Sequence, residues 1–456
     1  MRLRHGSREM DMTSGSLLPK ILLFSLPLIA SSILQLLFNA ADVVVVGRFG
    51  PDRENALAAV GSTGALINLI INIFLGLSVG ANVVIARYCG ANRPKEASEA
   101  VHTSVFLALF GGLFLAVIGF ALCHTFLIWM GSPEQVLPLA TLYMKIYFLG
   151  MPFNMLYNFG AAVLRSIGDT RRPLYYLMIA GIINVALNLF FVIVLNMSVA
   201  GVALATILSQ GVSATLVFLC LLRSHNVVHL DVRRIRLNFD RLKEIASIGL
   251  PAGLQGMCFS LSNVLIQSTI NSFGNIVMAG NTTAANLEGF VYVAMNALHQ
   301  AAVTFTSQNV GAGKTRRVRK VALECALASC AIGLALGGIM VALRYPLMGI
   351  YSDEEAVIQA GMIRMCIVVP TYFLCGLMDT LCGVLRGMGS TVTPMIVSVL
   401  GACAFRIFWI YAILPMNRTL EMLYLSYPIS WILTSAVHAV FCVRKFRQLP
   451  PEPQAA

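Results

Sequence analysis

The sequence predicts an all-α integral membrane protein with twelve transmembrane helices in two pseudo-symmetric six-helix bundles. Three observations predict this fold class. Hydrophobic residues make up 58% of the 456 residues and charged residues only 11%, whereas a soluble domain normally carries about 25% charged residues. Apolar runs of transmembrane length recur along the whole chain, and its two halves share a motif. At about 20 apolar residues per span, there is room for a dozen helices and for no soluble domain.

Charged residues and clusters of Gly and Pro separate the apolar runs. The first six predicted helices are centred near Leu34, Ile71, Gly112, Phe153, Ala186 and Gly211. The next six are centred near Ser260, Ala294, Gly333, Cys375, Leu400 and Leu433. The first run is too long for the core of a signal peptide and lacks a small-residue cleavage pattern, so we expect it to be retained as a span.

Lys and Arg are distributed unequally between the two sides of the predicted membrane. Most of the 32 lie in the N-terminal segment, the even-numbered connections and the C-terminal tail, while the other side carries only Arg48, Arg53, Arg344 and Arg418. Such residues gather in cytoplasmic loops, which predicts that both termini are cytoplasmic and that the number of spans is even. The same bias accounts for the net charge of +12 without any nucleic-acid partner.

An internal repeat divides the chain. "VLRSIGDTRRP" from Val163 recurs as "VLRGMGSTVTP" from Val384, and Leu26-Pro27 recurs as Leu250-Pro251. Because six spans is an even number, both halves enter the membrane from the same side, as in transporters with parallel repeats and a cleft between the halves. The predicted segments are an N-terminal tail (1–15), an N-terminal half (16–222), a linker (223–241), a C-terminal half (242–445) and a tail (446–456).

Polar side chains are costly in lipid and should face the protein interior. In the first helix, Gln35, Asn39 and Asp42 share one face, at i, i+4 and i+7. The other polar candidates of this half are Asn158 in the fourth helix, Asn184 and Asn188 in the fifth, and Thr206 in the sixth. Amides and hydroxyls often tie membrane helices together, but a carboxylate at this depth indicates a functional site.

The C-terminal half has polar candidates of its own: Asn263, Gln267, Glu288, Tyr292 and Asp379. Asp379 stands at the repeat equivalent of Asn158. Each of the two acids could attract a cationic substrate or pair with Arg364 or Arg406, and the sequence leaves both interpretations open. We expect these five residues, together with Gln35 and Asn39, to contact the substrate.

Sequence motifs for catalysis and nucleotide binding are absent. The chain contains no GxxxxGK[ST], HExxH or GxSxG pattern, so we expect neither an enzyme nor a cofactor. An ion gradient is then the expected source of energy, because one charge crossing about 100 mV yields about 2.3 kcal/mol. An intramembrane enzyme would need a convergent catalytic pair on facing helices, and a membrane receptor without transport is a further alternative.

Several stretches resemble the multidrug and toxic compound extrusion (MATE) family. They are "ADVVVVGR" at the end of the first helix, "VLRSIGDTRRP" after the fourth and "GVALATILSQ" in the sixth. The resemblance covers about residues 15–445, and its most specific part is the LR-x-x-G-[DS]-T motif, which is present twice. It implies the MATE/MOP-type fold and an inner-membrane exporter of amphipathic, often cationic compounds, coupled to H⁺ or Na⁺.

The resemblance also implies roles for individual residues. Asp42 matches the first-helix aspartate that binds the coupling cation, and it would be the metal ligand if that cation is Na⁺. The accompanying cation-coupling residues would be Asn158, Asn184, Asn188 and Thr206. Asn188 departs from the family, because many relatives carry aspartate there. Near Phe259 some relatives place a glutamate that this chain lacks.

The expected function is therefore cation-coupled antiport by alternating access. The expected partners are small organic, mostly cationic substrates and the lipid bilayer of a bacterial inner membrane, with the protein a monomer. The alternative is a flippase for a lipid-linked oligosaccharide or a related lipid. Such a flippase needs a more cationic cavity, whereas Glu288 and Asp379 oppose Arg364 and Arg406 here.

Overall fold

The computed structural model describes residues 10–49 and 53–452, and over these residues the chain forms helices and connecting loops without strands. It folds into two compact units. Unit 1 is built on Ala30–Gly253, and unit 2 on Met12–Ile29 and Leu254–Ala456, over the part of the chain that the structure describes.

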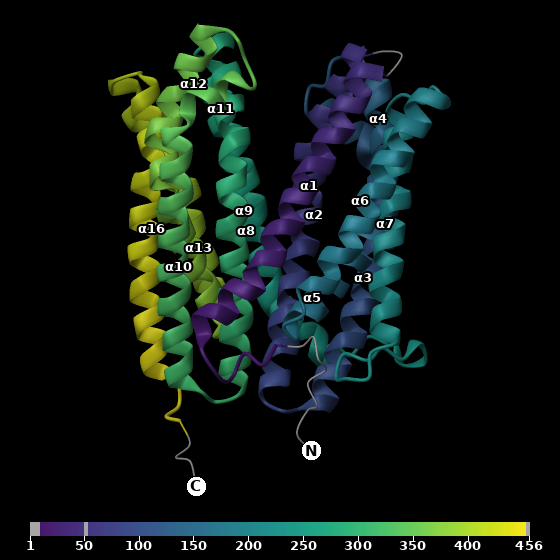
Figure 1. Ribbon diagram of the computed structural model, residues 1–456, viewed down its shortest axis with the longest axis vertical. Coiled ribbons are helices and arrows are strands. Elements are labelled where there is room, and N and C mark those ends of the chain that lie inside the picture. Colours follow the sequence, from purple (N-terminus) through teal and green to yellow (C-terminus); the bar gives the residue numbers. More distant parts are fainter. Residues whose placement is uncertain (1–9, 50–52, 453–456) are drawn as a thin grey trace. The chain divides into compact units, whose positions relative to one another are not determined.

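The first half of the chain forms six membrane-length segments. They are α1 (Leu17–Phe49), α2 (Arg53–Gly90), α3 (Pro94–Trp129), α4 (Leu137–Leu149) with α5 (Met151–Ser166), α6 (Arg171–Leu189) with the π-helical η1 (Phe190–Val194), and α7 (Val199–Leu222). A short 3₁₀ turn, η2 (Val232–Arg234), lies in the linker. α6 and α7 pack side by side (Figure 1).

The second half repeats this pattern. Its segments are α8 (Phe239–Asn271), α9 (Asn275–Gly311), α10 (Thr315–Ala342) followed by α11 (Arg344–Gly349), α12 (Glu355–Ile367) with η3 (Val369–Thr371) and α13 (Tyr372–Gly387), α14 (Val392–Ser398) with η4 (Val399–Ala404), α15 (Phe405–Phe408), η5 (Trp409–Ile413) and η6 (Leu414–Met416), and α16 (Leu420–Gln448). In Figure 1, α13 lies beside both α10 and α16.

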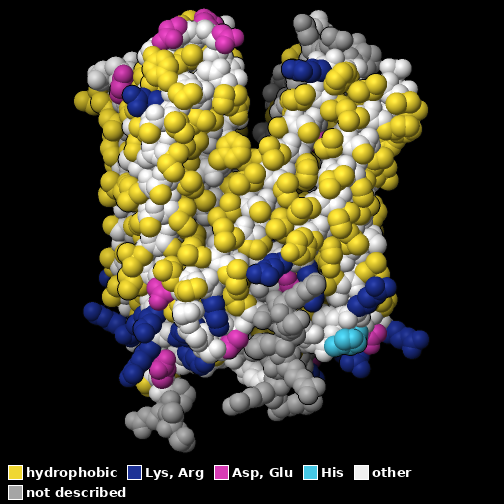
Figure 2. All heavy atoms as spheres, viewed as in Figure 1, with side chains coloured by type: hydrophobic (Ala, Val, Ile, Leu, Met, Phe, Trp, Pro, Cys, Tyr) yellow, Lys and Arg dark blue, Asp and Glu magenta, His cyan; other side chains and the backbone are white. Residues whose placement is uncertain are grey.

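These segments have the length and composition of membrane spans. Ten described helices are long and apolar enough to cross a bilayer. The two remaining segments are α4–α5, which is interrupted at Gly150, and the long but more polar α9. Figure 2 shows apolar side chains over the middle of each unit on the viewed face, with Lys and Arg gathered toward one end. The predicted all-α membrane fold with twelve helices is confirmed.

The repeated motif has the same backbone conformation in both halves. Gly168 follows α5 with φ +86°, and Gly389 follows α13 with φ +84°. Glycine adopts this left-handed region without the steric cost that a Cβ brings. The matching glycines end the matching helices, so the repeat seen in the sequence is also a repeat of local structure.

Small residues bring the first turns of α8 into unit 1. Gly76 of α2 faces Gly253 of α8, where a Cβ added to Gly76 would lie 2.2 Å from the Gly253 backbone nitrogen. Gly80 meets the α8 backbone at Ile245 in the same way. Glycines four residues apart let membrane helices approach at backbone distance. The beginning of α8 therefore packs in unit 1, before the chain continues into unit 2.

The beginning of α1 packs in unit 2 in a corresponding way. The rings of Phe24 and Phe305 meet edge to face at 5.5 Å, and the Asn309 side chain donates to the Met12 carbonyl at 3.1 Å. The compact units thus differ from the predicted sequence halves, 16–222 and 242–445. Each half's first helix is divided between the units, close to Pro27 and Pro251.

Candidate functional site

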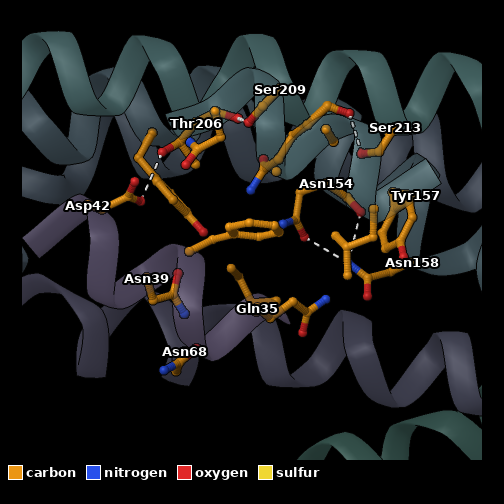
Figure 3. A pocket seen from close by; sticks show the side chains of 18 of the residues that line it. Gln35, Asn39, Asp42, Asn68, Asn154, Tyr157, Asn158, Thr206, Ser209 and Ser213 are labelled. Atoms are coloured by element: carbon orange, nitrogen blue, oxygen red, sulfur yellow. Dashed lines mark hydrogen bonds between the residues drawn. The ribbon is translucent and has the colours of Figure 1, made fainter. Parts of the chain in front are cut away.

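A polar cavity of about 270 Å³ lies inside unit 1. Helices α1, α2, α4, α5, α6 and α7 all contribute to its walls. Its polar lining residues are Gln35, Asn39, Asp42, Asn68, Tyr147, Asn154, Tyr157, Asn158, Asn184, Thr206, Ser209, Gln210 and Ser213. Figure 3 shows the α1 side chains facing those of α7 across the cavity. Asp42 is the one charged residue among those that line it.

The Asp42 carboxylate is held by neutral groups. It is 7% exposed, and one oxygen accepts a hydrogen bond from the Asn188 amide nitrogen at 2.5 Å. The other oxygen lies 3.4 Å from the Thr206 hydroxyl. The Asn188 nitrogen also donates to the Asn184 side-chain oxygen at 3.1 Å. Among the described residues Asp42 forms no ion pair, so its charge is not cancelled by a fixed cation.

Oxygen acceptors outnumber donors around Asp42. The side-chain oxygen of Asn188 is buried and has no hydrogen-bond partner. Thr206 has a single hydroxyl proton, and its closer acceptor is the Val202 carbonyl at 2.9 Å, not Asp42 at 3.4 Å. A cluster with surplus oxygen lone pairs and one carboxylate suits a proton or a hard cation such as Na⁺, which prefers oxygen ligands.

Two kinds of predicted residue share this cavity. Asp42, Asn184 and Thr206, predicted to bind the cation, line it together with Gln35 and Asn39, predicted to bind substrate. Asn188 is not among the lining residues, but it is fully buried and donates a hydrogen bond to Asp42. Asn158 lines the cavity farther along α5, where its amide donates to the Asn154 side-chain oxygen at 3.0 Å and not to Asp42.

The sequence interpretation missed several cavity residues. On α7, Thr206 is followed by Ser209, Gln210 and Ser213, which line the same cavity. These positions are i, i+3, i+4 and i+7, the spacing that revealed the polar face of α1. Asn154 likewise stands four residues before Asn158. The same rule, applied to every predicted helix, would have found these residues.

Among the predicted substrate residues of the C-terminal half, Glu288 has a fixed partner. Glu288 is 2% exposed and makes a two-pronged ion pair with Arg364, with both nitrogen–oxygen distances at 2.7 Å. Arg364 also donates to the Asn281 side chain at 2.7 Å. Of the two interpretations open for Glu288 in the sequence, the structure has the ion pair.

The other four candidates of this half lie on α8, α9 and α13. Gln267 accepts from Asn281 at 3.1 Å and so joins the Glu288–Arg364 network at its edge. Asn263 and Tyr292 are exposed on unit 2. Asp379 is half-buried, and its backbone carbonyl contacts the His299 ring at 2.6 Å.

A transition-metal centre is not indicated. Among the described residues, no group of three or more His, Cys, Asp or Glu side chains lies close enough to hold a metal. The oxygen-rich cluster around Asp42 differs from such a centre because amide and hydroxyl oxygens supply most of its candidate ligands.

Comparison with known proteins identifies the family. The MatE family model matches residues 27–190 and 251–412. The chain is 31% identical over 310 residues to the probable multidrug resistance protein YpnP of Bacillus subtilis, covering 68% of each chain. It is 27% identical over 330 residues to a FAD transporter of Shewanella oneidensis, covering 71% of each.

A solved structure gives the same fold. It is described as the outward-facing conformation of a multidrug resistance MATE family transporter of the MOP superfamily. The TM-score is 0.88 at 19% identity, and the match covers 98% of this chain and 99% of the other. The family match spans both halves of the repeat, and the members of this family are transporters, not enzymes. The chain is therefore a multi-pass membrane transporter that belongs to the MatE family.

Proposed function

We propose that this transporter is an antiporter that exports amphipathic, often cationic organic compounds in exchange for H⁺ or Na⁺. The observation that carries the proposal is the buried Asp42 carboxylate, which neutral oxygen-bearing side chains surround and which forms no ion pair among the described residues. A lone intramembrane carboxylate of this kind is expensive unless its charge serves the transport cycle.

The coupling follows from the contacts of Asp42. Binding of a proton or Na⁺ would neutralise the carboxylate and compete with the 2.5 Å hydrogen bond from Asn188. Asp42 lies on α1, and Gln35 and Asn39 on the same helix line the same cavity. A cation at Asp42 therefore changes the substrate-facing wall, and the conformation that it favours becomes more populated.

The substrate class has support from relatives. YpnP is a probable multidrug resistance protein, and several further relatives of this chain are named multidrug export proteins. The neutral, hydrogen-bonding lining of the unit 1 cavity, with a single acid, suits organic cations. The FAD transporter among the relatives indicates that family members also carry anionic aromatic compounds. None of these relatives is named as a flippase, so the lipid-linked oligosaccharide alternative has less support.

We further propose that both termini face the cytoplasm of a bacterial inner membrane and that the protein acts as a monomer. The gathering of Lys and Arg at one end of each unit, visible in Figure 2, supports this orientation by the positive-inside rule. The bacterial relatives support the inner membrane.

The test is transport in proteoliposomes. The purified protein is reconstituted, a pH gradient or a Na⁺ gradient is imposed separately, and movement of the fluorescent cation ethidium is followed. We expect either the pH gradient or the Na⁺ gradient to drive ethidium against the ethidium concentration gradient. Asp42→Asn should abolish this driven transport, whereas Asp42→Glu, which keeps a carboxylate, should retain part of it. Transport by Asp42→Asn at the wild-type rate would show that Asp42 is structural, and no transport under either gradient would contradict the proposal.

A further inference from the structure

Arg406 in the C-terminal half is a buried cation without a carboxylate partner. The residue is 4% exposed, and its Nε donates to the Ser430 hydroxyl at 2.9 Å. One terminal nitrogen, Nη2, is buried and has no hydrogen-bond partner. Among the described residues Arg406 forms no ion pair. Removing a charge from water costs several kcal/mol even after relaxation, so an unpaired intramembrane arginine indicates a functional site.

Aromatic rings surround this guanidinium. Arg406 lies 4.3 Å from the ring centre of Tyr427 and 5.5 Å from that of Trp431. Tyr372 packs edge to face against Trp431 at 5.2 Å and is half-buried. Tyr427 and Trp431 belong to the buried core, whereas Tyr372 is partly exposed, so the aromatic group leads from the buried guanidinium to one ring on which an aromatic compound can stack.

In the internal repeat, the position of Arg406 can be compared with the residues of the unit 1 site. Asn184 follows Pro173 by 11 residues and Arg406 follows Pro394 by 12. Tyr427 and Ser430, which Arg406 contacts, are the repeat equivalents of Thr206 and Ser209. At the same offset Asn184 corresponds to Phe405, so Arg406 stands one residue beyond the repeat equivalent of Asn184.

The sign of the charge differs between the two sites. Among the residues that line the unit 1 cavity the single charged group is the Asp42 carboxylate, and Ile266 stands at the equivalent position of α8. In the C-terminal half, Arg364 and Arg406 lie against the same Tyr427 ring, at 5.3 and 4.3 Å. Glu288 pairs with Arg364 alone. Among the described residues no carboxylate lies within ion-pair distance of Arg406, so this guanidinium has the capacity for one anion.

We propose that Arg406, with Tyr427, Trp431 and Tyr372, forms a binding site for the carboxylate of an aromatic substrate. The carboxylate accepts hydrogen bonds from Nη2 of Arg406, as Glu288 does from Arg364, and the aromatic body stacks on Tyr372. The site gives the transporter a second substrate chemistry besides that of the cavity around Asp42. The inference deepens the proposed function, because it assumes that the protein binds amphipathic organic compounds.

Two dyes that differ only in one carboxylate provide the test. Rhodamine 110 has a free carboxylate, and rhodamine 123 is its methyl ester. Binding of each to the purified full-length protein in detergent is measured by fluorescence polarisation, for wild type, Arg406→Gln and Arg406→Lys. Arg406→Gln should weaken rhodamine 110 binding about tenfold or more, because a charge-assisted hydrogen bond is lost, and should leave rhodamine 123 binding within about twofold. Arg406→Lys should retain part of the affinity for rhodamine 110.

A second substitution removes a negative charge instead of the positive charge of Arg406. Asp379 lies on α13, which packs against α16, the helix that carries the Arg406 contacts Tyr427 and Ser430. Asp379→Asn removes a negative charge, so it should strengthen rhodamine 110 binding relative to rhodamine 123 binding. Arg418, an exposed arginine that donates to Ser272, provides the matched control, since Arg418→Gln should alter neither dye's binding.

The outcomes separate this inference from the proposed function. Equal loss of both dyes in Arg406→Gln would assign Arg406 a structural role and overturn the inference. Failure of wild type to bind rhodamine 110, or unchanged binding in Arg406→Gln, would also overturn it. None of these results depends on a gradient, whereas ethidium transport in proteoliposomes tests the proposed function independently. Thermal unfolding of each variant in the same detergent checks that it is folded.

Discussion

Two acids in this chain resemble each other in the sequence and differ in the structure. Asp42 and Glu288 both stand in apolar helices, and both are almost fully buried. Helical periodicity predicted that each faces the protein interior. It could not predict the partner, because Arg364 lies 76 residues from Glu288 and its position depends on how α12 packs against α9. Glu288 is neutralised by an arginine, whereas Asp42 has only neutral partners.

Thr206 tests whether the oxygens around Asp42 act as cation ligands. Thr206→Val removes the hydroxyl at nearly constant volume, so the apparent affinity for the coupling cation should fall about tenfold, while Thr206→Ser should retain it. The measurement is the dependence of ethidium efflux on Na⁺ or H⁺ concentration. Identical concentration dependence in the Val and Ser variants would rule out Thr206 as a ligand.

Glu288 tests whether the buried ion pair is structural. Glu288→Gln leaves the Arg364 guanidinium buried without its carboxylate, so we expect a loss of about 3–5 kcal/mol in stability. Glu288→Gln combined with Arg364→Met should recover most of that loss, because neither charge remains buried. Thermal unfolding in detergent measures both. A Glu288→Gln variant of wild-type stability that has lost dye binding would instead assign Glu288 to the substrate.

Helix contacts in this protein depend on residues that carry no side chain. Gly76 and Gly80 on α2 and Gly249 and Gly253 on α8 allow backbone contact in unit 1. The spacing of these glycines is visible in the sequence, but the pairing of α2 with α8 is not, because the sequence of one helix does not determine which helix it packs against. The interruption at Gly150 and the π-helical turns of the segment from Val392 to Met416 were likewise not predicted. Pro152, which follows Gly150 by two residues and cannot donate a backbone hydrogen bond, was a local signal for the interruption that the periodicity did not use.

Substitution at Gly76 tests this helix contact. Gly76→Ala places a methyl group against the α8 backbone, where no flexible side chain can yield, so we expect about 2–3 kcal/mol of destabilisation. Gly61 on the same helix has no atom within 4 Å of the position that an alanine methyl group would occupy, and Gly61→Ala should have almost no effect. Thermal unfolding of the two variants is compared in one detergent. Equal stability of both would show that the α2–α8 contact is loose enough to admit a methyl group.

At the scale of the whole molecule, the repeat and the charge bias were the most informative parts of the sequence. They predicted twelve helices in two halves, which the structure confirms, and a cytoplasmic location for both termini, which stays a prediction. The sequence could not predict that the beginnings of α1 and α8 pack in the opposite unit from the remainder of each helix. That division depends on contacts between segments far apart in the chain, such as Phe24 with Phe305.

Fusion proteins test the orientation. Green fluorescent protein fused to the C-terminus should fluoresce, because it folds in the cytoplasm. Alkaline phosphatase fused within the loop between α3 and α4, near Pro133, should be active, because this loop is predicted to be periplasmic. A dark C-terminal fusion together with an inactive loop fusion would reverse the proposed orientation.

The most direct test of the central claim, that Asp42 exchanges a cation for substrate, measures the cation itself. Proteoliposomes receive an ethidium gradient and no ion gradient, and counter-movement of H⁺ is followed with a trapped pH indicator and that of Na⁺ with an isotope. We predict that ethidium movement drives one of the two cations in the opposite direction through the wild-type protein and drives neither through Asp42→Asn. Cation movement of equal size through Asp42→Asn would contradict the account.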